Sequence, residues 1–306
     1  MKKILKTDDA FFLSSEIVDY KKMGNVIEVS KLKCKPLKCP VRVLDGYSYV
    51  LLDTGEIKRF KINSKGRIDH VNSLYRTFKS IREIINTNVY DVSRVRWVTL
   101  TYAENMTDPK RLRKDFEAFN KRLKRYCSKY QLGDYEYINI VEPQARGAWH
   151  HHLFLIFDGE APFIPNSELA RIWSFGFVKI KALDDIDNIG AYFSAYLSDV
   201  TMDEVEKDEG FTIITDRVEV NKKVIDGQEK RVIKGGRLGY YPKGFRIIRT
   251  SQGIKKPVTE LVKYEKIKKE GSAKPSRSKT IRVIDKLTGK ELNTYRCIQY
   301  NISNRN

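Results

Sequence analysis

Hydrophobic and polar positions change their period several times along this chain, and these changes define the expected elements. Between residues 41 and 62 apolar and polar residues alternate around Asp45-Gly46 and Thr54-Gly55, which predicts a small β-meander. From residue 74 to residue 85 the apolar positions follow helical spacing. They come directly after Asn72-Ser73, which we interpret as the N-cap of this helix.

A regular succession of strands and helices follows between residues 95 and 200. Apolar, β-prone runs predict strands at residues 95–102, 135–141, 153–157 and 177–180. Helical spacing predicts helices that begin at Asp108-Pro109, Glu168 and Asp187-Asn188. The order β-α-β-β-α-β-α, with short connections, predicts an α+β domain in which helices cover one sheet.

Composition divides the chain into four expected parts. Residues 1–70 form a β-rich N-terminal segment, of which the first 30 or so are expected to be loosely held, and residues 71–202 form the core. Residues 203–262 contain a charged insertion and then a stretch rich in Gly, aromatic residues and Arg. Residues 263–306 are interpreted as a basic linker followed by a C-terminal hairpin.

The chain carries a large excess of positive charge. Its 58 Lys and Arg against 39 Asp and Glu give a net charge of +19. Such an excess repels itself, and phosphate backbones are the usual partner that relieves it. A solvated basic surface is the alternative; an acidic membrane is disfavoured because no basic amphipathic helix stands out. The DNA contacts that we expect are Arg122, Arg125, Arg146, Arg237 and Arg246.

The compartment is indicated by what the sequence lacks. No apolar run approaches the roughly 20 residues that cross a bilayer, and the N-terminus has no signal-peptide core. The 4 cysteines are scattered and form neither a disulfide framework nor a zinc-site pattern. We therefore expect a cytoplasmic protein with free thiols.

Three of the 4 histidines stand side by side at His150, His151 and His152. Because side chains alternate along a strand, His150 and His152 point to one face and His151 to the other. Two such imidazoles can bind one divalent ion, and Glu142, at the end of the preceding strand, is the nearest third ligand. A structural role is the alternative for each histidine taken singly.

Tyr192 and Tyr196 are four residues apart, so they share one face of the helix expected after Asn188. A phenol aimed at a metal-bound phosphate can attack it, form a phosphotyrosyl ester and release a deoxyribose 3′-OH. Both esters are of similar energy, so cleavage and rejoining can use one site. The alternative is a packing role, because both tyrosines fall on an apolar stripe.

Three blocks, in this order, resemble motifs 1, 2 and 3 of the HUH endonucleases that initiate rolling-circle replication. They are Val98-Thr99-Leu100-Thr101-Tyr102, His150-His151-His152 and Tyr192-x₃-Tyr196. The similarity extends over residues 70 to 260. The nearest group is the replication-associated proteins of small plasmids, mobile elements and phages, which includes the filamentous-phage replication initiator.

The resemblance implies an HUH endonuclease fold, a five-stranded antiparallel sheet flanked by helices with the histidine pair on a central strand. It also implies Mg²⁺ or Mn²⁺ as the cofactor, bound by His150, His152 and Glu142, and a nucleophilic tyrosine on the following helix. We favour Tyr196 as the nucleophile and Tyr192 as its partner. The family usually has a Lys three residues after the active tyrosine, a place taken here by Ala195 or Asp199.

The function implied by the resemblance is that of a rolling-circle replication initiator, encoded by a plasmid, phage or mobile element in a bacterial host. It would nick and rejoin single-stranded origin DNA through a 5′-phosphotyrosine intermediate. The alternatives are a relaxase or transposase of the same superfamily, or a non-catalytic DNA-binding replication regulator. The sequence lacks G-x-x-x-x-G-K-[ST], so we expect a host helicase to separate the strands and a host polymerase to copy them.

Overall fold

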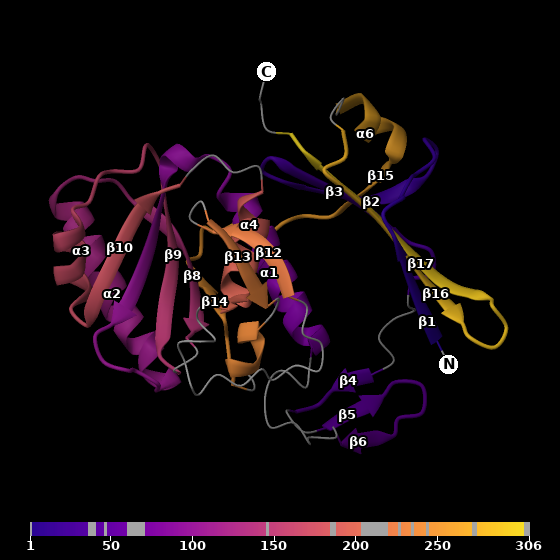
Figure 1. The fold of residues 1–306 in the computed structure, drawn as a ribbon, viewed down its shortest axis with the longest axis horizontal. Coiled ribbons are helices and arrows are strands. Elements are labelled where there is room, and N and C mark those ends of the chain that lie inside the picture. Colours follow the sequence, from indigo (N-terminus) through magenta and orange to yellow (C-terminus); the bar gives the residue numbers. More distant parts are fainter. Residues whose placement is uncertain are drawn as a thin grey trace. The chain divides into compact units, whose positions relative to one another are not determined.

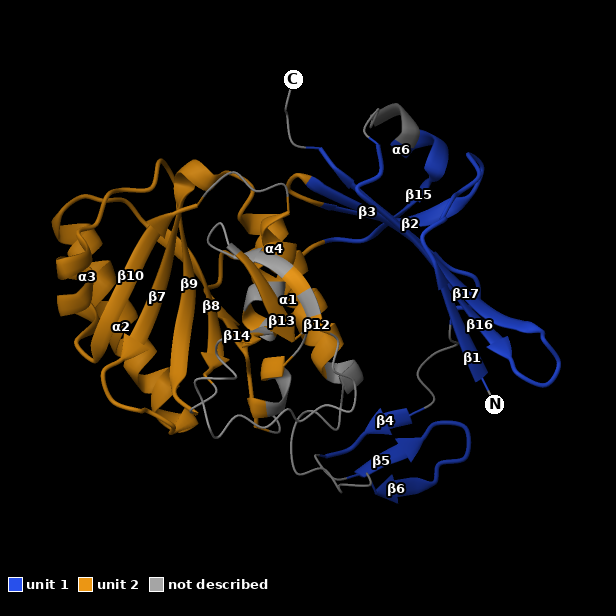
Figure 2. Cartoon of the chain, in the orientation of Figure 1, with its two compact units in different colours: residues 1–22, 26–65, 258–306 blue, residues 23–25, 66–257 orange. Residues whose placement is uncertain are grey.

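The chain divides into two compact units. A computed structural model describes residues 2–35, 41–45, 48–59, 71–144, 147–183, 188–202, 220–225, 228–233, 236–242, 245–270 and 274–302. Unit 1 combines residues 1–22, 26–65 and 258–306, and unit 2 combines residues 23–25 and 66–257 (Figure 2). The two ends of the chain therefore belong to the same unit.

A five-stranded antiparallel sheet forms the centre of unit 2 (Figure 1). Its strands are β7 (Val95–Tyr102), β8 (Tyr135–Pro143), β9 (Trp149–Phe157), β10 (Gly176–Ala182) and β14 (Ile248–Thr250). Their order is β10-β7-β9-β8-β14, so β9 lies in the middle. The expected α+β class and the central position of the strand with the histidines are both confirmed.

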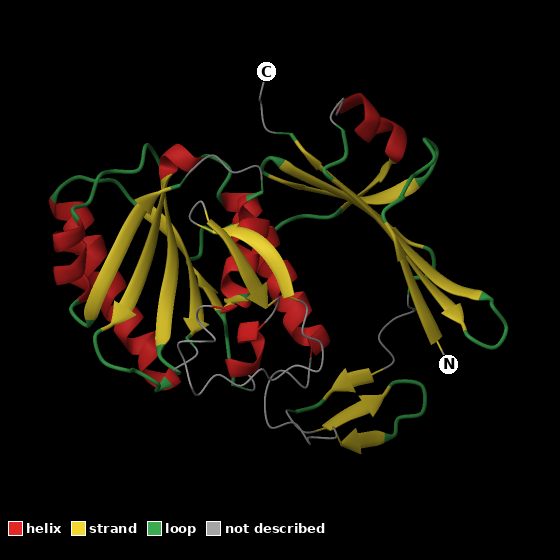
Figure 3. Ribbon diagram, viewed as in Figure 1, coloured by secondary structure: helices red, strands yellow, loops and turns green. Residues whose placement is uncertain are grey.

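Helices cover both faces of this sheet (Figure 3). They are α1 (Val71–Asn88), α2 (Pro109–Lys129), α3 (Asn166–Trp173) and α4 (Ile189–Ser198). One face packs on α2 and α3, where Phe116 and Trp173 both contact the ring of His151. The other face packs on α4, which in turn contacts α1.

The helix starts show which local signals were sufficient. Asp108 caps α2 by accepting a hydrogen bond from the Lys110 amide at 2.9 Å, and Pro109 occupies the first turn, as the sequence predicts. Helix α1 instead begins at Val71, so the prediction that Asn72-Ser73 caps it was wrong. Both residues lie in the first turn, where short polar side chains are well tolerated.

Unit 1 is built on a six-stranded sheet of order β1-β16-β17-β3-β2-β15. The strands are β1 (Lys2–Thr7), β2 (Ile17–Met23), β3 (Val26–Leu32), β15 (Glu260–Lys263), β16 (Arg277–Asp285) and β17 (Glu291–Asn301). Helix α6 (Tyr264–Glu270) contributes Tyr264 and Ile267 to a core that includes Phe12 and Val29.

Two sequence predictions for unit 1 were wrong, and one is confirmed. The first 30 residues are not a loose lead, because β1, β2 and most of β3 come from them. Residues 263–277 are not only a linker, because α6 lies there. Both segments gain order from partners far away in the sequence, which local patterns cannot reveal. The C-terminal hairpin is confirmed as β16 and β17.

A partly buried ion pair joins both ends of the chain within unit 1. Arg296 donates to Glu16 at 2.6 Å, and Lys31 donates to the same carboxylate at 2.9 Å. The Arg296 guanidinium also lies 4.8 Å from the centroid of the Phe12 ring. Burial opposes ionisation of Glu16, but these donors prevail and lower its pKa to about 2.

Two smaller sheets complete the described structure. Strands β4 (Val41–Val43), β5 (Ser48–Leu51) and β6 (Ile57–Arg59) form the expected meander. Strands β12 (Val220–Ile225) and β13 (Gln228–Ile233) form a hairpin that pairs with β11 (Val200–Thr201) directly after α4. None of the helices in the described ranges has the length and apolar character needed to span a bilayer.

Candidate active site on the face of the central sheet

The histidine triplet is split between the two faces of β9. His151 is buried against α2, with its ring stacked 5.7 Å from Phe116 and its Nδ1 3.1 Å from Asn139 Oδ1. His150 and His152 occupy the opposite face, and their ring centroids are 6.4 Å apart. The predicted alternation is confirmed, and only one face of the sheet carries the pair.

Glu142 reaches the same face from the neighbouring strand. It stands directly opposite His150 in the pairing of β8 with β9. Its carboxylate contacts His152 Nε2 and forms an ion pair with the guanidinium of Arg237. The structure therefore brings together the three residues expected to bind metal, and adds an arginine to them.

The electrostatics of this group follow from burial. Glu142 and His152 are 2% and 1% exposed, respectively. Burial lowers the pKa of His152 to about 4, so its imidazole is neutral at neutral pH and can act as a ligand. Burial also lowers the pKa of Arg237 to about 10, which leaves its guanidinium charged and able to balance Glu142.

The donor set has the chemistry of a divalent-cation site, with two imidazoles and one carboxylate on adjacent strands. Within the described ranges, however, no three His, Cys, Asp or Glu side chains are arranged to hold a metal ion. The positive charge beside Glu142 in this arrangement is that of Arg237, which also donates to the Asp199 carbonyl at 3.0 Å. Arg237 thus has a partner that the sequence did not indicate.

Helix α4 is fixed to the same face by one aromatic side chain. The Phe193 ring packs edge-on against Trp97 at 4.7 Å and Phe154 at 4.6 Å between centroids. The predicted cap is confirmed at Asn188, whose Oδ1 accepts from the Ala191 amide at 2.9 Å. The helix that carries both candidate tyrosines therefore packs on the sheet face that carries the histidine pair.

The two tyrosines are described to different extents. Tyr192 is 41% exposed and lies edge-on to Phe193 at 5.2 Å between ring centroids. Tyr196 belongs to α4, but its side chain lies outside the described part of the structure. Their catalytic assignment stays a prediction.

A close approach between α1 and α4 sets the position of α4. Asn86 donates to Asn188 Oδ1 at 2.9 Å and accepts from the Gly190 amide at 2.7 Å. A Cβ on Gly190 would lie 2.6 Å from Asn86 Oδ1 and closer still to the Arg82 carbonyl oxygen. Only glycine fits at this crossing.

The edge strand β10 presents residues that the sequence reasoning did not assign to function. Phe177 and Lys179 pair across β7 with the rows that contain His150 and His152. Phe177 is 69% exposed, and the Lys181 ammonium lies 5.8 Å from the Trp97 ring centroid. The alternation of β10, with one aromatic and two lysines on the histidine face, was the signal that could have identified them.

The arginines expected to contact DNA have different environments. Arg122 donates to the carbonyls of Ile172 and Trp173 at 2.7 and 3.0 Å, and so fastens α2 to the end of α3. Arg125 and Arg246 are exposed, while Arg146 lies outside the described residues. DNA binding by these side chains stays a prediction.

The fold and site define an α+β domain with a histidine pair and an acid on one face of an antiparallel sheet. The family described as replication-associated protein ORF2 matches residues 95–201, which run from β7 to β11. The phasyl DNA replicon protein arp of Escherichia coli is 25% identical over 153 residues, 42% of this chain and 51% of that protein. The chain thus spans about half the length of this relative. No solved structure matches. These likenesses support a replication-initiator family.

Proposed function

We propose that the protein initiates rolling-circle replication by nicking and rejoining single-stranded origin DNA, in the manner of HUH endonucleases. The observation that carries the proposal is the meeting of Glu142, His150 and His152 on the face on which α4 packs. The matched family segment, residues 95–201, contains all of these elements. The net charge of +19 suits a polyanionic substrate.

The proposal assigns metal binding to His150, His152 and Glu142, with Mg²⁺ or Mn²⁺ as the ion. When bound, such an ion would polarise the scissile phosphate and offset the charge that develops on its oxygens. Glu142 would then exchange the Arg237 guanidinium for the ion, and the freed guanidinium could bind a DNA phosphate. His152 needs no deprotonation for this role, because burial already keeps it neutral.

The chemical step assigned to α4 is a transesterification. The phenolic oxygen of Tyr196 attacks phosphorus, the bond from phosphorus to the 3′-oxygen breaks, and that oxygen leaves with a proton as the free 3′-OH. The 5′-phosphate remains on the tyrosine. The reverse attack by a 3′-OH rejoins the strand, and Tyr192 serves as the second phenol of a strand-transfer cycle.

The substrate side of the proposal uses the edge strand β10. Phe177 offers an exposed ring on which a base can stack, and Lys179 and Lys181 supply charge to the backbone beside it. Such contacts tolerate any sequence, so recognition of the origin needs further residues. Host helicase and polymerase remain the partners that we propose for strand separation and copying.

The test is capture of the covalent intermediate. Purified protein is incubated with Mn²⁺ and labelled single-stranded DNA that has fixed arms and a random centre, and adducts are resolved under denaturing conditions and sequenced. We expect a covalent adduct in the wild type that is abolished in His152→Ala and Tyr196→Phe. Tyr130→Phe, a change at a 51% exposed tyrosine after α2, is the matched control and should keep the adduct.

The outcomes separate the candidate functions. If Tyr192→Phe rather than Tyr196→Phe abolishes the adduct, the nucleophile is Tyr192 and the mechanism stands. If the wild type binds the DNA but forms no adduct with any divalent ion, the nickase proposal fails. A non-catalytic replication regulator then takes its place, an alternative favoured by the ion pair of Glu142 with Arg237.

A further inference from the structure

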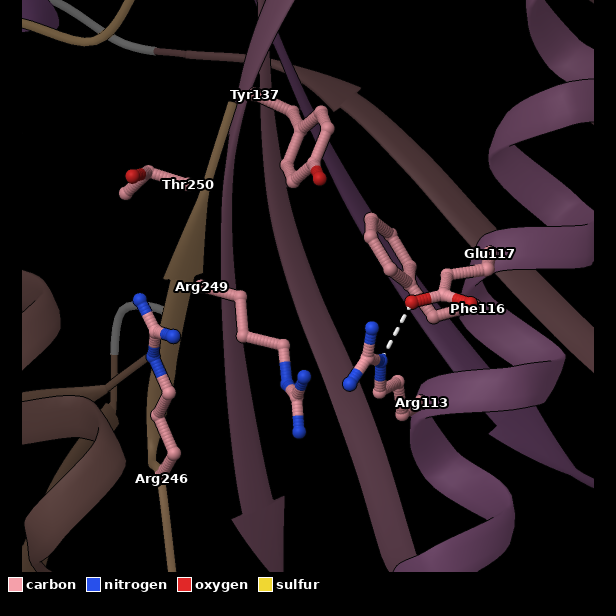
Figure 4. A pocket seen from close by; sticks show the side chains of 7 residues that line it. All are labelled: Arg113, Phe116, Glu117, Tyr137, Arg246, Arg249 and Thr250. Atoms are coloured by element: carbon pink, nitrogen blue, oxygen red, sulfur yellow. Dashed lines mark hydrogen bonds and ion pairs between the residues drawn. The ribbon is translucent and has the colours of Figure 1, made fainter. Parts of the chain in front are cut away.

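A basic pocket lies on the face of the central sheet opposite to the histidine pair. It has a volume of about 210 Å³ and is lined by Arg113, Phe116, Glu117, Tyr137, Arg246, Arg249 and Thr250 (Figure 4). Tyr137 and Arg249 belong to β8 and β14 and share the parity of His151, whose ring stacks on Phe116. The space is that of a few water molecules, enough for one phosphate group.

The charges in this pocket do not balance. Three arginines face one another, and Glu117 is the single acid among the described residues that line it. Arg113 pairs with Glu117 at 2.6 Å, the dashed contact in Figure 4. Two guanidinium groups, those of Arg246 and Arg249, are therefore left in positive excess.

Arg249 carries most of the inference. Its side chain is half-buried, and in the described part of the chain it makes neither a hydrogen bond nor an ion pair. Burial, and then the like charges of Arg113 and Arg246, lower the pKa of Arg249. A protein that buries a guanidinium beside two others gains little from the contact itself, whereas a bound anion offsets the repulsion.

The shape of the pocket favours phosphate over other anions. A guanidinium offers a planar fork of donors that matches two oxygens of a phosphate group, and two such forks flank the space. The Tyr137 ring packs edge-on against Phe116 at 5.1 Å and forms an apolar wall beside them. Strand β14 is an edge strand, so a nucleic acid backbone can pass along this side.

We propose that this pocket binds a backbone phosphate of DNA, at an anchoring site separate from the nicking face. The inference rests on the proposed function for the identity of the polyanion. It extends that function by assigning Arg249 and Arg113, which the sequence did not single out, and by giving Arg246 a defined location. DNA held on both faces of one sheet would remain bound when the nicked strand is released.

The test compares charge changes inside the pocket with identical charge changes outside it. Arg249→Gln and Glu117→Gln alter the pocket, while Arg171→Gln and Glu168→Gln alter an exposed ion pair on α3. Binding of dye-labelled single-stranded and duplex oligonucleotides is measured by anisotropy between 50 and 200 mM salt. Melting curves and circular dichroism verify that each variant folds.

We expect Arg249→Gln to weaken binding about tenfold, the loss of one charge-assisted contact. The slope of log affinity against log salt should become shallower by roughly 0.7 to 0.9, the value for one phosphate. Glu117→Gln should bind more tightly than the wild type, because it removes the opposing charge. The two α3 variants should change neither quantity appreciably.

Equal effects of Arg249→Gln and Arg171→Gln would overturn the proposal. If Arg249→Gln does not fold, Glu117→Gln still decides, since no gain in affinity over Glu168→Gln refutes it. A melting series with inorganic phosphate separates the sources of the anion: stabilisation of wild type alone, with equal DNA affinity for Arg249→Gln, means a free-anion site and refutes DNA anchoring. Adduct formation is scored separately, so loss of nicking with retained pocket effects removes only the proposed function.

Discussion

Replacement of Gly190 by alanine tests whether the crossing of α1 and α4 positions the tyrosine helix. A Cβ at this position would collide with Asn86 Oδ1 and with the Arg82 carbonyl oxygen. Overpacking of this kind costs about 1–3 kcal/mol, and a distorted hydrogen bond from the Gly190 amide adds about 0.5–1.5 kcal/mol. Alanine returns about 1 kcal/mol through its better helix propensity. The net loss is about 1–3 kcal/mol.

The stability assay is thermal melting beside a matched control. For a unit of this size the loss should lower Tm by roughly 2–10 °C. Gly159→Ala is the control, because a Cβ there would meet nothing within 4 Å, and its Tm should stay the same or rise. Equal melting of the two variants would refute the steric argument.

The functional assay is the single-turnover rate of adduct formation at saturating DNA, below the melting range. A displacement of α4 by about 1 Å can cost a factor of about 100 in rate through lost alignment. We expect Gly190→Ala to lose rate at nearly unchanged DNA affinity. A variant that melts lower and yet reacts at the wild-type rate would show that α4 does not carry the nucleophile.

Three further changes test other parts of the structure. Arg237→Gln leaves Glu142 buried without its countercharge, so it should destabilise the protein by about 3–5 kcal/mol; millimolar Mn²⁺ should raise its Tm more than that of wild type, and equal shifts would exclude Glu142 as a ligand. Glu16→Gln should cost about 2–3 kcal/mol at pH 7, since the carboxylate has a pKa of about 2 when folded and 4.5 when unfolded. That stability is present above pH 4.5 and lost as the pH falls toward 2, so melting of wild type and Glu16→Gln should converge at low pH, and parallel curves would contradict the assignment. Phe177→Ala should weaken single-strand binding by about 1–3 kcal/mol, whereas Phe163→Ala, at an 81% exposed ring, should have little effect in the same anisotropy titration.

The sequence predicted the core of unit 2 because its signals there are local. Alternation specified β7 to β10, and Asp108 and Asn188 capped helices by contacts within three residues. Unit 1 was not predicted, because its strands acquire order from partners at the other end of the chain. No periodicity within residues 1–30 indicates that β3 pairs with β17.

The candidate site divides in the same way. The alternation of β9 predicted that His150 and His152 share a face, and the end of β8 placed Glu142 opposite them. Arg237 was expected on DNA, but it forms a buried ion pair, since only the folded chain brings η3 (Gly236–Tyr240) to the sheet. The pocket around Arg249 also needed the structure, because α2, β8 and β14 meet there from distant parts of the sequence.

The topology of unit 1 imposes an order on biosynthesis. Strand β17 lies between β16 and β3, and 258 residues separate Lys33, directly after β3, from its partner Glu291 at the start of β17. At about 5–20 residues per second, the ribosome needs roughly 13–50 s to make that interval. Unit 2 can fold during this time, while β2 and β3 wait with an open edge that invites association with other chains. The last strand translated thus determines when the first ones are protected.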